Sequence, residues 1–124
     1  MYTVVMGAGT DTERTLRKAR MIVDLPTATD SLAVVLVQAG DDTAGPSNSV
    51  TLFDEHGVDT TVETVSTDPP TALVEVAADH GADLICVGGR TRSPAGKAQL
   101  RGGAQSVIVN ADRPVLVAGE PGDH

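Results

Sequence analysis

Apolar residues along this chain occur in short continuous runs, separated by longer segments in which they recur every three or four positions. A continuous run that ends in glycine or a polar turn is typical of a strand buried on both faces of a parallel sheet. Such runs predict five strands, at residues 2–6, 32–37, 60–65, 84–87 and 115–117. The third alternates β-branched with polar residues, so we expect it near an edge of the sheet.

The segments between these runs have the spacing of helices. They predict helices between residues 10 and 26, at about 50–56, between 69 and 80, and at about 104–111. Thr10 to Glu13 forms a capping box at the start of the first helix. Four basic residues of that helix are assigned to a solvated face paired with local acids: Arg14, Arg17, Lys18 and Arg20.

The last two helices have recognisable packing faces. In the third, the residues expected to share a face are Leu73, Val76, Ala77 and His80. In the fourth, the recurring apolar residues are Ala104, Val107, Ile108 and Ala111. Pro114 ends this last helix before the final strand.

Strands that alternate with helices predict a parallel sheet covered on both faces. With right-handed crossovers, the economical topology is a single doubly wound, Rossmann-like α/β sheet of strand order 3-2-1-4-5. We expect one domain over residues 1–119, followed by a polar tail at 120–124. Ligands of such sheets bind at the carboxyl ends of the strands, where the strand order reverses, here between strands 1 and 4.

Glycine-rich turns follow both of these strands. The first turn is Gly7-Ala8-Gly9 and the second is Gly88-Gly89-Arg90-Thr91, which opens a polar, basic loop extending to about Lys97. Glycines let the backbone approach an anion, and the helix that follows supplies free N–H groups. Four of the nine basic residues lie here: Arg90, Arg92, Lys97 and Arg101. The loop is either a phosphate-binding loop or a solvated loop whose arginines offset an acidic surface, and the two readings stay open.

Composition narrows the class of protein. Asp and Glu outnumber Lys and Arg 17 to 9, and no lysine or arginine occurs between Arg20 and Arg90. Such a surface repels nucleic acid and anionic membrane, so neither is an expected partner. Aromatic residues make up 2% of the chain, which also disfavours base-stacking platforms. The excess of acids is typical of a halophilic protein from a high-salt cytoplasm, or of an ordinary acidic cytosolic protein.

Catalytic and metal-binding patterns are not apparent in the sequence. The histidines His56, His80 and His124 lack ligand spacing, so no metal site is predicted. Ser93 and Ser106 lack a nucleophile-elbow context, and we lean against an enzyme. The single cysteine, Cys86, lies within a predicted buried strand and suits a reducing compartment. No signal peptide or apolar run of transmembrane length is visible, so a cytoplasmic location is expected.

The carboxyl-terminal third carries a family resemblance. Its motifs are Val87-Gly-Gly-Arg-Thr-Arg-Ser-Pro-Ala-Gly-Lys97, then Gln105-Ser106, then Asp112-Arg-Pro-Val-Leu-Val117. With the opening strand, the capping box and the element order, the chain resembles the universal stress protein family, especially its haloarchaeal members. The resemblance implies a homodimer formed by pairing the last strands, through Val115, Leu116 and Val117. Some members of this family bind ATP or AMP, and others bind no nucleotide.

The ATP-binding pattern of that family is degenerate here. Gly88 matches its first glycine, but Thr91, Arg101 and Gly102 depart from the other three positions. Gly9 stands where ATP-binding members carry an aspartate that holds the ribose, while Val37 matches the residue beside the adenine. The side chain of Arg101 would either grip a phosphate or occupy its site.

The resemblance therefore implies a universal stress protein-like domain with a stress-response or regulatory role, which needs no cofactor and does not bind ATP in the usual way. One alternative is an ATP- or AMP-binding member that uses magnesium and hydrolyses ATP weakly. Its contacts would be Gly7, Ala8, Gly9, Val37, Val87, Gly88, Arg90, Thr91, Arg101, Gly102 and Gly103. Another alternative is a structural dimerisation partner of an ATP-binding relative.

Overall fold

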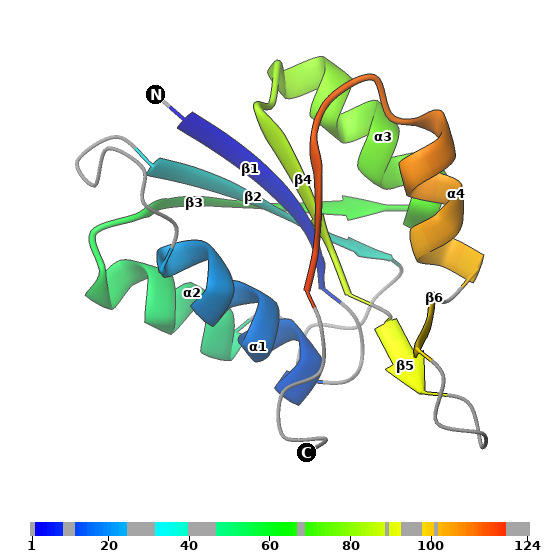
Figure 1. Ribbon diagram of the computed structural model, residues 1–124. Helices are drawn as coiled ribbons and strands as arrows, with labels where there is room; N and C mark the ends of the chain where they lie inside the picture. Colours follow the sequence, from blue (N-terminus) through cyan, green and yellow to red (C-terminus); the bar gives the residue numbers. More distant parts are fainter. Residues whose placement is uncertain are drawn as a thin grey trace.

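The protein is a parallel β-sheet between two layers of helices (Figure 1). This computed structural model describes residues 2–8, 12–24, 32–39, 47–66, 69–88, 90–92, 98–100 and 102–118. Gly9 and Arg101, two of the predicted site residues, lie outside these ranges. The boundary between domain and tail expected near residue 119 also lies outside them, so the domain limits remain a prediction.

The central sheet has five strands, all parallel to their neighbours. They are β1 (Tyr2–Ala8), β2 (Leu32–Ala39), β3 (Asp59–Val65), β4 (Leu84–Val87) and β7 (Val115–Val117). Their order is β3-β2-β1-β4-β7. This confirms the predicted order 3-2-1-4-5 and the Rossmann-like α/β class.

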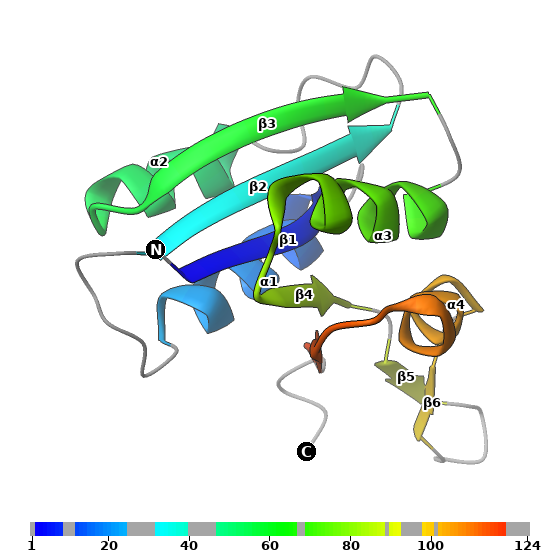
Figure 2. The ribbon, with the colours of Figure 1, turned by 90° about the horizontal axis from the view of Figure 1, so that it is seen from above.

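Helices cover both faces of the sheet (Figures 1 and 2). One layer holds α1 (Thr12–Val23) and α2 (Ser47–Glu55), and the other holds α3 (Pro69–His80) and α4 (Gly102–Asn110). The first two crossovers thus lie on one face and the next two on the other. This arrangement makes β1 and β4 the pair at which the winding direction reverses.

Two aliphatic cores fill the spaces between these layers. Successive strand residues point to opposite faces, so Val4 and Met6 of β1 pack towards α1 and α2, whereas Val5 packs towards α3 and α4. All four residues of β4 are buried. The continuous apolar runs in the sequence therefore reflect strands that bury both faces. Phe53 of α2 is fully buried and is the chain's only phenylalanine.

Strand β3 is an edge of the sheet, as its alternating sequence predicts. Its described residues alternate between half-buried and exposed along much of the strand, and Val62 is 42% exposed. The opposite edge is β7, whose three residues are all half-buried. This second edge of the sheet consists of apolar residues only.

The prediction of a continuous loop from Gly88 to about Lys97 is wrong in part. Within it, β5 (Arg90–Arg92) pairs antiparallel with β6 (Ala98–Leu100), and Thr91 lies opposite Gln99. This small sheet lies beyond the carboxyl end of β4, next to the start of α4 (Figures 1 and 2). Backbone pairing stabilises it without an apolar pattern, so hydrophobic periodicity could not detect it.

Three helix predictions also need correction. The second helix begins at Ser47 rather than near residue 50. His80 is exposed, and its Nε2 atom lies 3.1 Å from Glu63 Oε1, because the packed face of α3 ends at Ala77. Ile108 is 39% exposed, whereas Val107 beside it is buried.

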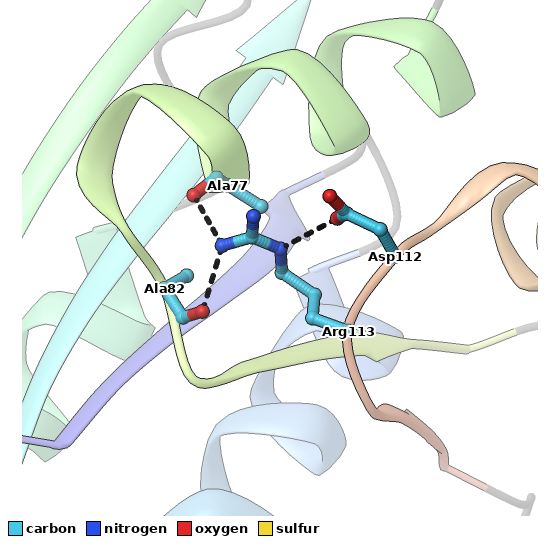
Figure 3. A network of polar contacts seen from close by, with 4 residues as sticks. All are labelled: Ala77, Ala82, Asp112 and Arg113. Carbon is cyan, nitrogen blue, oxygen red and sulfur yellow. Dashed lines mark hydrogen bonds and ion pairs between the residues drawn. The ribbon is translucent and has the colours of Figure 1, made fainter.

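A single arginine joins the start of β7 to the end of α3 (Figure 3). Arg113 Nη1 donates hydrogen bonds to Ala77 O at 2.9 Å and to Ala82 O at 2.8 Å. Its Nε donates to Asp112 Oδ1 at 3.1 Å and, with its charge, lowers the pKa of that carboxyl. We call these two hydrogen bonds from Arg113 to Ala77 O and Ala82 O the Arg113 clamp. They satisfy carbonyls at the end of α3 and hold the chain in place directly before Pro114 and β7.

Candidate functional site

Strands β1 and β4 stop pairing before their carboxyl ends. Their last paired residues are Met6 and Cys86. Beyond that pair, Gly7 and Ala8 remain paired only with β2, while Val87 pairs with Val117 of β7. We call the ends of these two strands, Gly7, Ala8, Val87 and Gly88, the switch point. It is the position at which doubly wound sheets bind ligands.

Neither glycine of the switch point is needed for an unusual backbone conformation. Among the described residues, positive φ angles occur at Gly57 and Gly81, and not at Gly7 or Gly88. A Cβ atom at Gly7 would lie 3.7 Å from Leu73 Cδ1 and 3.8 Å from Lys18 Nζ. A Cβ atom at Gly88 would lie 3.5 Å from Lys18 Cδ. The neighbour shared by the two glycines is therefore the side chain of Lys18.

Arg20 is exposed, as predicted for the basic residues of α1, but the prediction is wrong for Lys18. Its side chain is half-buried, and its Nζ atom donates a 2.6 Å hydrogen bond to Gly7 O. The Cγ, Cδ and Cε atoms of its stem all lie within 4 Å of the position of a Cβ atom at Gly88. The side chain thus extends from α1 across the end of β4 to the end of β1, and places an ammonium group at the switch point.

The sequence contained a signal for this placement. Thr15, Ala19 and Ile22 are buried in α1. Lys18 lies three residues after Thr15 and four before Ile22, so it borders the packed face of the helix. The four basic residues of this helix were predicted as one solvated group. Lys18 differs from Arg20 because it borders the packed face, whereas Arg20 is exposed.

The charge of Lys18 also affects the pKa of the Cys86 thiol. Cys86 is fully buried in β4, as predicted, and is a free cysteine. Burial raises the pKa of the Cys86 thiol to about 11, and the positive charge of Lys18 opposes part of that increase.

Cys86 should resist thiol reagents while the protein is folded. With a pKa of about 11, the thiolate is roughly a hundredfold scarcer at pH 8 than for an ordinary cysteine, and burial restricts access further. Labelling with a maleimide or an aromatic disulfide should therefore be slow at pH 8 and rapid in denaturant. Fast labelling of folded protein would contradict the burial of β4.

The predicted site residues do not all converge in the described part of the chain. Gly7 pairs with Val37, and both Val37 and Val87 belong to the core beneath α3 and α4. Arg90 and Thr91 form part of β5. Gly102 and Gly103 are the first two residues of α4.

A buried amide close to these residues was not predicted. Gln38 follows Val37 at the carboxyl end of β2 and is 7% exposed. Its Nε2 donates to Thr64 Oγ1 at 3.2 Å, while its Oε1 is buried and has no hydrogen-bond partner among the described residues. An unsatisfied acceptor of this kind costs free energy, so it is a polar feature beside the switch point that packing does not explain.

The described residues lack two other kinds of feature. They contain no group of three or more His, Cys, Asp or Glu side chains that could hold a metal ion. In the same part of the chain, no helix is long and apolar enough to span a membrane.

Comparisons with known proteins place this geometry in context. A sequence profile of the universal stress protein family matches residues 10–119. No curated protein sequence matches the chain. A universal stress protein structure from Archaeoglobus fulgidus is 25% identical, with a TM-score of 0.72 over 94% of this chain and 98% of that one.

Two solved relatives contain nucleotides. A universal stress protein from Archaeoglobus fulgidus in complex with dAMP is 20% identical, with a TM-score of 0.65 over 94% of this chain and 97% of that one. A family protein from Arabidopsis thaliana with AMP bound is 12% identical, with a TM-score of 0.73 over 99% of this chain and 94% of that one. At these identities, the likeness to the two complexes concerns the fold.

Proposed function

The chain belongs to the universal stress protein family, and on that basis we propose that it is a stress-response or regulatory domain that binds a nucleoside monophosphate at the switch point. The supporting observation is the arrangement of Gly7 and Gly88 at the separated ends of β1 and β4. Both glycines lie at the end of the sheet where ligands of doubly wound folds bind. Relatives of the same fold contain AMP and dAMP.

We do not propose ordinary binding of magnesium ATP. Thr91 occupies a position where ATP-binding relatives carry glycine, and here it lies in β5 opposite Gln99. A residue committed to an antiparallel pair is less free to wrap around a chain of phosphates than a loop glycine. A single phosphate makes smaller demands on that segment than a triphosphate does.

AMP should bind at least about tenfold more tightly than magnesium ATP, a difference of roughly 1.4 kcal/mol. Calorimetric titration of the purified protein with each nucleotide measures this difference directly. Equal or tighter binding of magnesium ATP would show that the basic loop serves the triphosphate despite its sequence. If neither nucleotide binds, the proposed nucleotide-binding function is wrong, and the alternative of a structural role remains.

We also propose a homodimer formed through β7. Ile85 N donates to Pro114 O at 3.0 Å, and Ala118 N donates to Val87 O at 2.7 Å. In a parallel ladder, alternate residues bond to the same neighbour, so the backbone groups of Val115 and Val117 point to the open edge. An apolar edge with outward amides favours pairing with another strand. A second copy centred on Leu116 would pair each Val115 with the partner's Val117.

A cytoplasmic location fits this role. The chain carries 17 acids against 9 bases, and the described Cys86 is a free thiol. A free buried cysteine suits a reducing compartment. The excess of acidic groups suits a high-salt cytoplasm, because salt screens their mutual repulsion.

A further inference from the structure

Lys18 holds a defined position at the switch point. Two observations locate it there: the 2.6 Å hydrogen bond from its Nζ to Gly7 O, and the position of its stem within 4 Å of where a Cβ atom at Gly88 would lie. Its effect on the pKa of Cys86 agrees with both. An ammonium group on a four-carbon stem normally extends into water, so holding it across two strand ends costs side-chain entropy and hydration.

The position of this cation is unusual for such an acidic chain. The net charge is −8, and Lys18 and Lys97 are the chain's only lysines. Folding nevertheless brings a positive charge to the end of the sheet where ligands of this topology bind. A cation at this position favours an anionic ligand such as a phosphate, because charge-assisted hydrogen bonds are roughly twice as strong as neutral ones.

We propose that Lys18 contacts the phosphate group of the ligand bound at the switch point. This inference rests on the proposed nucleotide function and adds the residue that recognises the anion. The chain thereby binds one phosphate with a lysine from α1, whereas ATP-binding relatives use the loop and helix that follow strand 4. An ammonium group has three N–H donors, so it can bond to Gly7 O and to a phosphate oxygen together.

The substitution Lys18→Met tests the contact, because methionine keeps an unbranched apolar stem against Gly88 and removes the charge. We expect AMP affinity to fall roughly tenfold or more, the loss typical of one charge-assisted hydrogen bond. Adenosine, which lacks the phosphate, should bind the variant and the original protein with similar affinity. If Lys18 recognises the phosphate group alone, the affinity of the variant for inorganic phosphate should fall by the same factor as its affinity for AMP.

Arg20→Met is the matched control. Arg20 lies on the same helix, is exposed, and its loss changes the net charge by the same amount. Screening at physiological salt should limit its effect on AMP affinity to about twofold. If both variants lose the same amount of AMP affinity, the effect of Lys18 comes from net charge and not from a contact, and the proposal is overturned.

The remaining outcomes separate the two proposals. If Lys18→Met binds AMP as tightly as the original protein, or more tightly, Lys18 does not contact the phosphate. If inorganic phosphate binds in a Lys18-dependent way while AMP does not, the phosphate site stands and the nucleotide function fails. If neither AMP nor phosphate binds at millimolar concentration, both proposals fail.

A second measurement needs no variant. The two lysines can be acylated in the folded protein and quantified by mass spectrometry, with and without saturating AMP or phosphate. A bound phosphate should slow the acylation of Lys18 severalfold relative to the ligand-free protein. Unchanged acylation of Lys18 under saturation would exclude the contact even if Lys18→Met fails to fold.

Discussion

Replacing Val117 by proline should convert the proposed dimer to monomers at concentrations where the original protein pairs through β7. Proline removes the N–H that points to the open edge of β7 and leaves the bonds of Pro114 and Ala118 to β4 in place. A symmetric dimer loses two hydrogen bonds, each worth about 1 kcal/mol net, so its dissociation constant should rise at least roughly thirtyfold. Sedimentation or light scattering over a dilution series measures this shift.

Val117→Ala is the control for that experiment. The Val117 side chain packs against the core beneath α3 and α4, so any substitution there also removes apolar contacts. Alanine removes those contacts but keeps the amide, and the variant should stay dimeric. If Val117→Pro remains as dimeric as the original protein, the interface lies elsewhere. The next surface to test would then be α4, where Ile108 is 39% and Val109 75% exposed.

Replacing Arg113 by methionine should lower the free energy of unfolding by about 2 kcal/mol. The side chain is only 18% exposed, and its guanidinium bonds to carbonyls of Ala77 and Ala82. Ala77 O also accepts a bond from Ala82 N at 2.9 Å, so the larger penalty should fall on Ala82 O. For a chain of this size, the loss corresponds to a fall of roughly 8 °C in melting temperature, measurable by calorimetry.

Asp112→Asn separates the clamp from the adjacent ion pair. The Asp112 side chain is 77% exposed, and exposed pairs contribute little to stability. This variant should therefore unfold at nearly the same temperature as the original protein. A loss as large as that of Arg113→Met would mean that Asp112, and not the two carbonyls, gives Arg113 its importance.

Much of the fold could be predicted because it depends on local pattern. Runs such as Leu84 to Val87 are apolar on both faces, and only a strand covered on two sides buries them completely. Right-handed crossovers then leave few possible orders for strands that alternate with helices. The burial of Cys86 and the edge position of β3 follow from the same reasoning.

The candidate site could be predicted only in part. Gly7 and Gly88 do lie at the carboxyl ends of β1 and β4, which share one edge of the sheet, but the predicted turn at Gly7 and Ala8 is wrong because both residues belong to β1. The orphaned acceptor on Gln38 was missed because burial of a polar group cannot be read from a continuous β-strand pattern. The β5–β6 pair was missed because its residues carry no apolar alternation.

Periodicity and motifs within short segments were enough to predict the five strands of the central sheet, their order, the two helix layers and the family. They were not enough to predict β5 and β6 or which distant residues lie together, because these depend on tertiary packing. Lys18 meets Gly88, 70 positions along the chain, and Arg113 bonds to Ala77, 36 residues away. Helix periodicity shows which face a lysine borders, but not which strand ends lie within its reach. That depends on how α1 packs across β1 and β4, which is set by the whole core.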